Sequence, residues 1–207
     1  MKKFLLMIFS LSSLMVSTNV VAQKKKTVAP LATNSLSEDA IIKAQNFRLI
    51  GPFRGGRAAS AVGSYTDVNT FYMGATGGGV WKTTDAGSNW KNISDGFFGG
   101  SMGAIAIAPT NESTVYVGEG ENSMRGNVSE GLGGMWKSTD DGKTWKNMGL
   151  KEARHIVRII VHPKNPDIVW VAAMGHLFGP NETRGVFKST DGGQNWKKVL
   201  YVNEQTG

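Results

Sequence analysis

The stretch Ser138-Thr139-Asp140-Asp141-Gly142-Lys143-Thr144-Trp145 decides the fold, because the same order of residue types occurs twice more in the chain. The other two copies are TTDAGSNW at 83–90 and STDGGQNW at 189–196. The equivalent aspartates, Asp85, Asp140 and Asp191, are 55 and 51 residues apart. Self-similarity at a nearly constant period of this length indicates a tandem repeat of one supersecondary unit.

The segments around each copy predict the unit itself. In the second copy, apolar runs at 104–108, 115–117 and 134–137 precede the octapeptide, and the turn-forming Pro109-Thr110-Asn111 separates the first two. The octapeptide is the turn that leads from the third strand to a fourth, so each unit contains four short strands. Four strands in about 50 residues, repeated in tandem, are typical of β-propeller blades. We predict an all-β fold of three four-stranded blades, an incomplete ring, at approximately 56–93, 102–148 and 154–201.

The octapeptide has a structural use that requires no substrate. An aspartate at the head of a tight turn accepts hydrogen bonds from backbone N–H groups two or three residues further on, and a following glycine takes the positive φ that other residues avoid. The tryptophan packs under the turn. We expect these residues to support the turn rather than to act in catalysis: Asp85, Gly87, Trp90, Asp140, Gly142, Trp145, Asp191, Gly193 and Trp196.

Composition excludes several functions. The chain has 207 residues and a formal charge of +7, but five of its lysines lie at 2, 3 and 24–26. Without them the charge falls to +2, and no basic stripe interleaved with aromatic residues remains, so we expect no nucleic-acid partner. There is no cysteine, and the three histidines lack ligand spacing. We therefore predict no metal and no cofactor.

The amino terminus follows the secretory pattern. A positive start precedes an apolar run from Phe4 to Val16 and small residues at Val20 and Ala22. The run is too short for the roughly 20 apolar residues that a bilayer core needs, and no later segment is long enough. We predict a signal peptide at 1–22, an amino-terminal tail at 23–45 and a partial propeller at 46–207. The protein is expected to be exported, to the periplasm or the extracellular space.

Candidate binding residues gather on one face of the predicted blades. The connections of a meander alternate between its two ends, so the loops between strands two and three share an end with the crossings between blades. These loops differ in length between copies, as binding loops on a rigid scaffold do. Basic side chains that could converge on a ligand there are Arg54, Arg57, Arg125, Arg154 and His176.

Acids and aromatic residues on the same face provide further candidates. Glu119 and Glu121 are two residues apart near a strand end, so both could point to one side, as glycosidase carboxylate pairs require. Pairing with arginine, or solvation, is the alternative for these two glutamates. Most aromatic rings are explained by the repeat; the rings free to stack on a ligand are chiefly Phe97, Phe98 and Phe178.

The octapeptide resembles the Asp-box, or BNR repeat, of sialidases, sortilin-type receptors and xyloglucan-hydrolysing propellers. From Phe47 to Gly207 the chain looks like the amino-terminal part of large secreted bacterial BNR or sortilin-type proteins that are often described as glycosyl hydrolases. In the xyloglucan-hydrolysing propellers the resemblance implies a catalytic aspartate just before Gly77-Gly78, and here that position is Ala75.

Two functions follow from this resemblance. The first is an exported propeller module that binds glycan or peptide through its loops. The alternative is a part of a glycoside hydrolase whose active site needs blades beyond this chain, so whether the protein is an enzyme is left open at this point. Propellers have at least four blades. Further blades, from a longer chain or a partner, are therefore expected.

Overall fold

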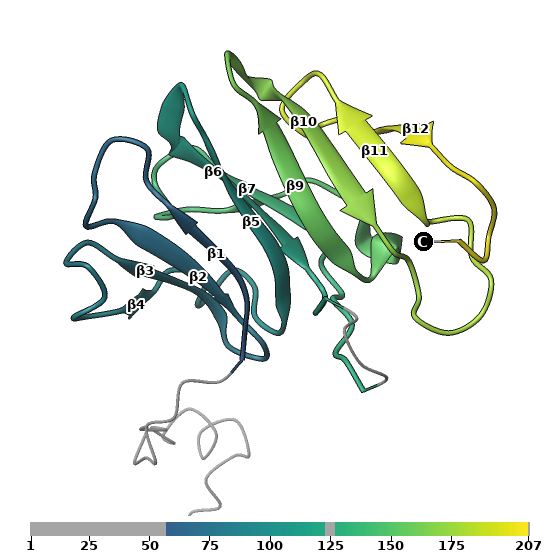
Figure 1. The fold of residues 1–207 in the computed structure, drawn as a ribbon, viewed down its shortest axis with the longest axis horizontal. Helices are drawn as coiled ribbons and strands as arrows, with labels where there is room; N and C mark the ends of the chain where they lie inside the picture. The colour runs from purple at the N-terminus through teal and green to yellow at the C-terminus, as the bar shows by residue number, and fades with distance from the viewer. Residues whose placement is uncertain (1–56, 123–126, 207) are drawn as a thin grey trace, which may run out of the picture. The chain divides into compact units, whose positions relative to one another are not determined.

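Twelve short strands form three antiparallel sheets in the described part of the chain, one for each copy of the repeat (Figure 1). A computed structural model describes residues 57–122 and 127–206, all within one compact unit, Gly51–Gly207. The expected signal peptide (1–22) and tail (23–45) lie outside the described residues. No helix in the described part is long and apolar enough to cross a membrane.

Each sheet is a meander, and we call the three sheets blades 1, 2 and 3. Blade 1 contains β1 (Ala58–Gly63), β2 (Phe71–Ala75), β3 (Gly79–Thr83) and β4 (Lys91–Asn92). Blade 2 contains β5 (Met102–Ala108), β6 (Asn111–Glu119), β7 (Met135–Ser138) and β8 (Lys146–Asn147). Blade 3 contains β9 (Ile156–His162), β10 (Asn165–Ala173), β11 (Gly185–Ser189) and β12 (Lys197–Leu200).

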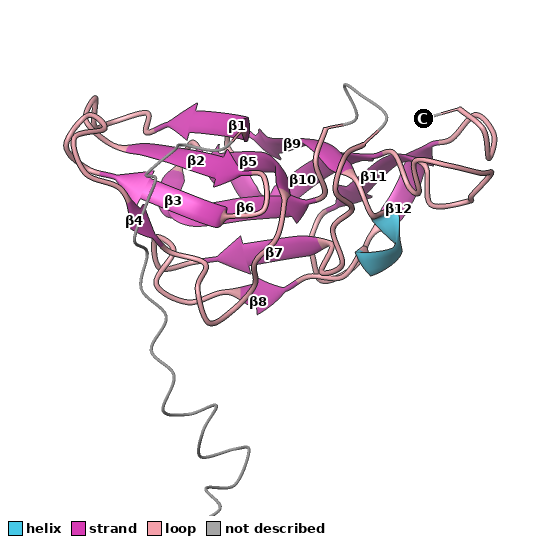
Figure 2. Cartoon of the chain, turned by 90° about the horizontal axis from the view of Figure 1, so that it is seen from below, coloured by secondary structure: helices cyan, strands magenta, loops and turns pink. Residues whose placement is uncertain are grey.

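The strands of every blade are hydrogen-bonded in chain order, as the four-stranded unit requires. A 3₁₀ turn, Lys151–Ala153, lies in the connection between blades 2 and 3, where Figure 2 shows it in cyan. The predicted all-β fold of four-stranded propeller blades is confirmed.

The hydrophobic core consists of two layers, each between neighbouring blades. Strand β5 is buried along its whole length. Its isoleucines, Ile105 and Ile107, belong to the layer shared with blade 1, and its alanines, Ala104, Ala106 and Ala108, to the layer shared with blade 3. Because successive side chains of a strand point to opposite faces, the alternation of alanine and isoleucine gives β5 small side chains toward blade 3 and large ones toward blade 1.

The tryptophans of the octapeptides connect neighbouring blades. Trp145 Nε1 donates a hydrogen bond to the carbonyl of Ile93 in blade 1, and Trp196 Nε1 donates to the carbonyl of Met148 in blade 2, both at 2.8 Å. Trp90 has the same position in blade 1, where no preceding blade is present in the described residues, and it is 37% exposed. The octapeptide tryptophan thus forms a hydrogen bond to the preceding blade wherever that blade is described.

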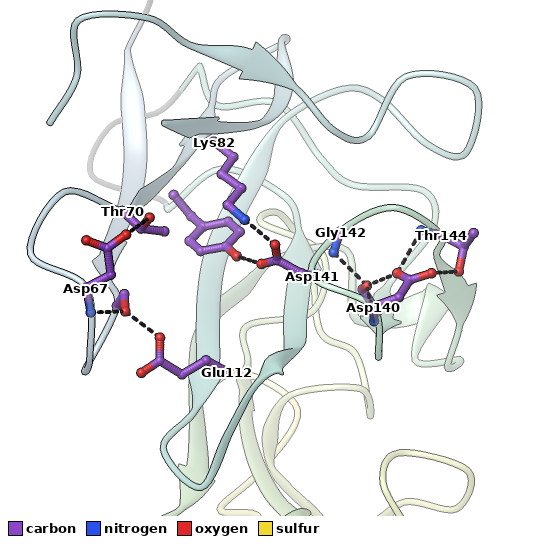
Figure 3. A network of polar contacts seen from close by, with 11 residues as sticks. Asp67, Thr70, Lys82, Glu112, Asp140, Asp141, Gly142 and Thr144 are labelled. Carbon is purple, nitrogen blue, oxygen red and sulfur yellow. Dashed lines mark hydrogen bonds and ion pairs between the residues drawn. The ribbon is translucent and has the colours of Figure 1, made fainter. Parts of the chain in front are cut away.

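Polar contacts close the seam between blades 1 and 2 (Figure 3). The Tyr72 hydroxyl and the Lys82 ammonium, both of blade 1, contact the carboxylate of Asp141 in blade 2. The Ser64 hydroxyl donates in the same direction, to Glu112. Burial, and secondarily the hydrogen bond to Asp141, raise the pKa of Tyr72 far above its ordinary value. The phenol therefore remains a hydrogen-bond donor at neutral pH.

Candidate functional site

The connections lie at two ends of the blades, and the octapeptide turns mark one of them. In each blade, an N–H of this turn donates to a carbonyl just before the second strand or within its first three residues, at 2.9 Å: Ala86 to Asn69, Asp141 to Ser113 and Gly192 to Asp167. We call this end the box face. The opposite end, which we call the loop face, carries the loops between the second and third strands of each blade and the crossings from blade to blade.

Each octapeptide aspartate closes its turn by accepting hydrogen bonds from the residue four positions on. Asp140 accepts from the Thr144 backbone N–H at 2.8 Å and from the Thr144 hydroxyl at 2.6 Å. The Ser138 hydroxyl donates to Asp140 at 2.8 Å and accepts from the Gly142 N–H at 2.8 Å. The first and third copies repeat this pattern, with Asn89 and Asn195 as donors.

The span of four residues is longer than the two or three expected from sequence. The reason is local backbone geometry: two successive residues after the aspartate have positive φ, 64° at Asp141 and 83° at Gly142. The expected positive φ is present at all three glycines, since Gly87 has φ 90° and Gly193 has φ 94°. This double left-handed step carries the chain back to the carboxylate one residue later than a simple turn does.

The turn contacts favour the charged form of each carboxylate. They lower the pKa of Asp85, Asp140 and Asp191 from 3.8 to about 2. The largest cause is the backbone N–H of Asn89 or Asn195 in the first and third copies, and the Thr144 side chain in the second. A carboxylate held in this way serves as a hydrogen-bond acceptor and has no proton to give at neutral pH.

On the loop face, Glu119 anchors the loop that follows it. Its carboxylate accepts from the N–H groups of Leu132 and Gly133 at 3.1 and 2.9 Å, and from Trp136 Nε1 at 2.7 Å. Glu119 is only 5% exposed. A Cβ added to Gly133 would overlap the Glu119 carboxylate, so the glycine at this position lets the loop close on the acid.

Glu121 connects two blades. Arg57 of blade 1 donates to it through Nε and Nη2 at 2.9 and 3.0 Å, the bidentate geometry of an arginine–carboxylate pair. The N–H of Ser129 donates to the same carboxylate at 3.2 Å, and His155 Nδ1 lies 2.8 Å from the Glu121 carbonyl oxygen. Both predicted residues, Arg57 and Glu121, therefore meet each other.

The two glutamates take separate partners. Strand alternation would put them on one side, but Gly120 between them has φ 95°, which breaks the alternation just beyond β6. The carboxylate of Glu119 contacts its own blade, whereas that of Glu121 contacts Arg57 of blade 1. Pairing with arginine, the alternative kept open for these acids, is the arrangement seen at Glu121.

The other basic candidates in the described residues also have acidic partners. Arg154 Nη2 lies 3.0 Å from Glu152, and His176 Nδ1 lies 3.5 Å from Glu130. The remaining two candidates, Arg54 and Arg125, lie outside the described residues. Each described basic candidate thus lies beside a carboxylate of its own.

Aromatic side chains divide into packed and exposed ones. Phe98, expected to be free, stacks on Trp136 with ring centroids 4.6 Å apart and meets Trp145 edge-on. That expectation was wrong because the crossing after blade 1 folds onto blade 2, a contact the repeat pattern does not encode. Phe178 is 77% exposed and Phe97 is 43% exposed.

Arg184 is the loop-face residue whose role the sequence did not reveal. It is 9% exposed and donates to the carbonyls of His176 at 2.9 Å, Gly179 at 3.2 Å and Gln205 at 3.2 Å. These bonds hold the loop that carries Phe178. The position of Arg184 at the end of a long loop was the only sequence signal for this role.

Comparison with known proteins gives consistent matches. Residues 78–205 match the model of the Sortilin-Vps10 family, described as sortilin, neurotensin receptor 3. A xyloglucanase of Hypocrea jecorina is 27% identical over 136 residues, 59% of this chain and 15% of its own. Xyloglucanase Xgh74A of Acetivibrio thermocellus is 28% identical over 174 residues, 72% of this chain and 19% of its own.

A solved structure supports the same fold. The crystal structure of an ancestral GH74 enzyme superimposes with a TM-score of 0.58 at 22% identity, covering 79% of this chain and 20% of that one. At this identity the likeness shows the fold. The chain spans less than a fifth of the length of the two curated relatives.

Proposed function

Because the chain belongs to the Sortilin-Vps10 family, we propose that it is an exported Asp-box β-propeller module that binds a glycan through its loop face. Both curated relatives are named xyloglucanases, so xyloglucan is the first glycan to test. The secretory pattern at 1–22 supports export. We assign the box aspartates a structural role on the strength of their turn contacts and their lowered pKa.

The observation that carries the proposal is how the loop face is built. Two glycine-rich loops are held from the inside by buried charged side chains, Glu119 in blade 2 and Arg184 in blade 3. Each loop then projects a large apolar side chain outward: Leu132 is 70% exposed and Phe178 is 77% exposed. Apolar and aromatic groups fixed on an ordered scaffold are a common basis of recognition, because little conformational entropy is lost on binding.

Binding without hydrolysis is favoured over catalysis by the state of the acids. The Glu119 carboxylate accepts three hydrogen bonds from its own blade, and the Glu121 carboxylate is paired with Arg57. Ala75 occupies the position where the family resemblance implies a catalytic aspartate. Part of a glycoside hydrolase is the second candidate, and the names of the two curated relatives favour it.

A polysaccharide-binding experiment tests the proposal. The chain is run through native gels containing xyloglucan or other polysaccharides, and its dissociation constants are measured by calorimetry. Phe178→Ala is expected to weaken binding by about tenfold, because truncation of a central aromatic contact is costly. Tyr65→Ala is the matched control, since Tyr65 is a 62% exposed aromatic residue on the box face, and its affinity should not change. Unchanged affinity in Phe178→Ala, or retention by a peptide panel but by no polysaccharide, would reject the proposal.

A second assay on the same chain distinguishes the hydrolase candidate from the binding module. Release of reducing ends from each polysaccharide is measured for the chain and for Glu119→Gln and Glu121→Gln, with thermal melting to establish that each variant folds. Turnover that is lost in a folded Gln variant would favour the hydrolase. Absence of turnover together with specific binding would favour the binding module.

A further inference from the structure

The seams between blades follow one polar rule. We call the face of a blade that meets the next blade in chain order its trailing face, and the opposite face its leading face. On the trailing face of blade 1, Lys82 lies over the Tyr72 ring at 5.3 Å, and both contact Asp141 on the leading face of blade 2. A lysine–aromatic pair thus meets an acid.

The second seam repeats the rule with an acid from a different position. Lys137 lies over the Tyr116 ring at 5.2 Å and pairs with Asp167 at 3.1 Å. The residue equivalent to Asp141 in blade 3 is Gly192, and a Cβ added there would lie 2.6 Å from Asp167 Oδ1. Asp167 therefore fills the space that the Asp141 side chain occupies in blade 2. The charge contact is kept although the residue that supplies it has changed.

Blade 3 carries the same lysine–aromatic pair without an acid. Trp170 and Lys188 are cross-strand partners, as are Tyr72 and Lys82 of blade 1, and Lys188 Nζ lies 5.0 Å from the Trp170 ring centroid. Within residues 57–122 and 127–206, no carboxylate pairs with Lys188. Whereas Tyr72 is 2% exposed, Trp170 is only half-buried. The trailing face of blade 3 is thus half of a seam.

An apolar groove continues this face. It has a volume of about 210 Å³ and is lined by Val186, Leu200, Tyr201 and Val202, among others. Leu200 is 59% exposed and Val202 is 66% exposed. In blades 1 and 2 the residues that follow the fourth strand, Ile93 and Met148, accept the tryptophan of the next blade.

We propose that the trailing face of blade 3 docks a further four-stranded blade whose leading face carries a carboxylate, at the position of Asp141 or at that of Asp167. This inference deepens the proposed function by stating the chemistry of the module's partner. An unaltered second copy does not fit, because blade 1 has Ala86 and Asn69 at these two positions. Charge complementarity with Lys188, next to the apolar groove, favours an acidic blade.

The test supplies the missing acid in a second copy of the chain. Ala86→Asp places a carboxylate at the position of Asp141, and Asp141 itself has φ 64° where Ala86 has φ 55°, so the backbone accepts the change. Self-association of the full chain is measured by sedimentation velocity over a concentration series. The Ala86→Asp protein should associate roughly tenfold more tightly than the unaltered chain, the effect expected of a close charge pair at an interface.

Two further variants make the result specific. Lys188→Met in the Ala86→Asp background should return association to the level of the unaltered chain. Thr84→Asp, which adds the same charge to the same exposed turn, should have no effect. Circular dichroism melting establishes that each variant folds.

Every outcome decides the question. Equal association of the Ala86→Asp and Thr84→Asp proteins, or association that survives Lys188→Met, overturns the proposal. Tight association of the unaltered chain would identify a second copy as the partner and also overturn it. None of these measurements uses a glycan, so a failure here is distinct from a failure of the loop-face proposal.

Discussion

At the scale of the residue, the box aspartate has two roles in its turn. It caps the turn through Thr144 or its equivalents and orders the serine or threonine hydroxyl that in turn accepts from the glycine N–H. Because all of these bonds favour the carboxylate over the carboxylic acid, the turn is most stable when the aspartate is ionised.

The lowered pKa gives the Asp140 turn a defined pH dependence. The pKa is about 2 in the folded protein and the ordinary value is 3.8, so the stabilisation is complete above about pH 4 and is lost as the pH falls through about 2. We expect Asp140→Asn to lower the melting temperature at pH 7 and to differ little from the unaltered chain near pH 2. Asp95→Asn, at an exposed aspartate after β4, is the control. A deficit that is constant from pH 7 to pH 2 would contradict this account.

At the scale of the element, neighbouring blades are joined by the indole N–H of an octapeptide tryptophan, which donates to the preceding blade. The indole N–H of Trp145 bonds the carbonyl that follows β4, and the indole of Trp196 bonds the carbonyl that follows β8. A turn residue of one blade thereby satisfies the backbone of the blade before it. The first blade presents the same group, Trp90, with no partner among the described residues.

This difference predicts unequal effects of one substitution at equivalent sites. Trp145→Phe removes the bond to Ile93 and part of a buried ring, so it should lower the free energy of unfolding by about 1–3 kcal/mol. Trp90→Phe should change it by less than about 0.5 kcal/mol, as exposed substitutions usually do. Chemical denaturation monitored by circular dichroism provides both values. Equal losses at the two positions would show that the contact between blades does not determine the effect.

At the scale of the whole molecule, burial is greatest in the middle of the repeat array. Both core layers include side chains of blade 2, one layer shared with blade 1 and the other with blade 3. Among the residues that the structure describes, blades 1 and 3 each have one face covered by a neighbouring blade. In a repeat protein whose units contact only their neighbours, stability is distributed in the same way.

Hydrogen exchange should report that gradient. Amide protons of β5 and β6 should exchange most slowly, and those of β1 and β12 fastest among the strands, because opening an outer blade disrupts one core layer whereas opening blade 2 disrupts two. Exchange followed by mass spectrometry on the native chain at neutral pH measures this order. Protection of β12 equal to that of β5 would mean that the described part opens as one cooperative unit.

The fold was predictable because its signals are local and repeated. Three octapeptides in phase with their flanking apolar runs determined the strand count, the order of the blades and the box glycines with positive φ. The donor four residues after the aspartate was missed because the left-handed residue that precedes the box glycine is Ala86 or Asp141 in the first two copies, and neither residue type signals a positive φ.

The loop face was predictable only in part, because its contacts join distant segments. Glu121 and Arg57 were both candidates, but their sequence separation of 64 positions conceals that they pair with each other. The bend at Gly120 that separates Glu119 from Glu121 depends on one φ angle. Stacking of Phe98 on Trp136 depends on how a crossing folds, which periodicity does not specify.

The interchange of Asp141 and Asp167 has a practical consequence for protein engineering. At the alignment column of Asp141 the three repeats have Ala86, Asp141 and Gly192, and at the column of Asp167 they have Asn69, Ser113 and Asp167. Each column has an acid in only one of three repeats, so an idealised repeat that requires a majority residue would specify an acid at neither place. In arrays built from such an average, the trailing-face lysine would have no acid opposite it at any junction, so designers should choose the residues of the two columns together.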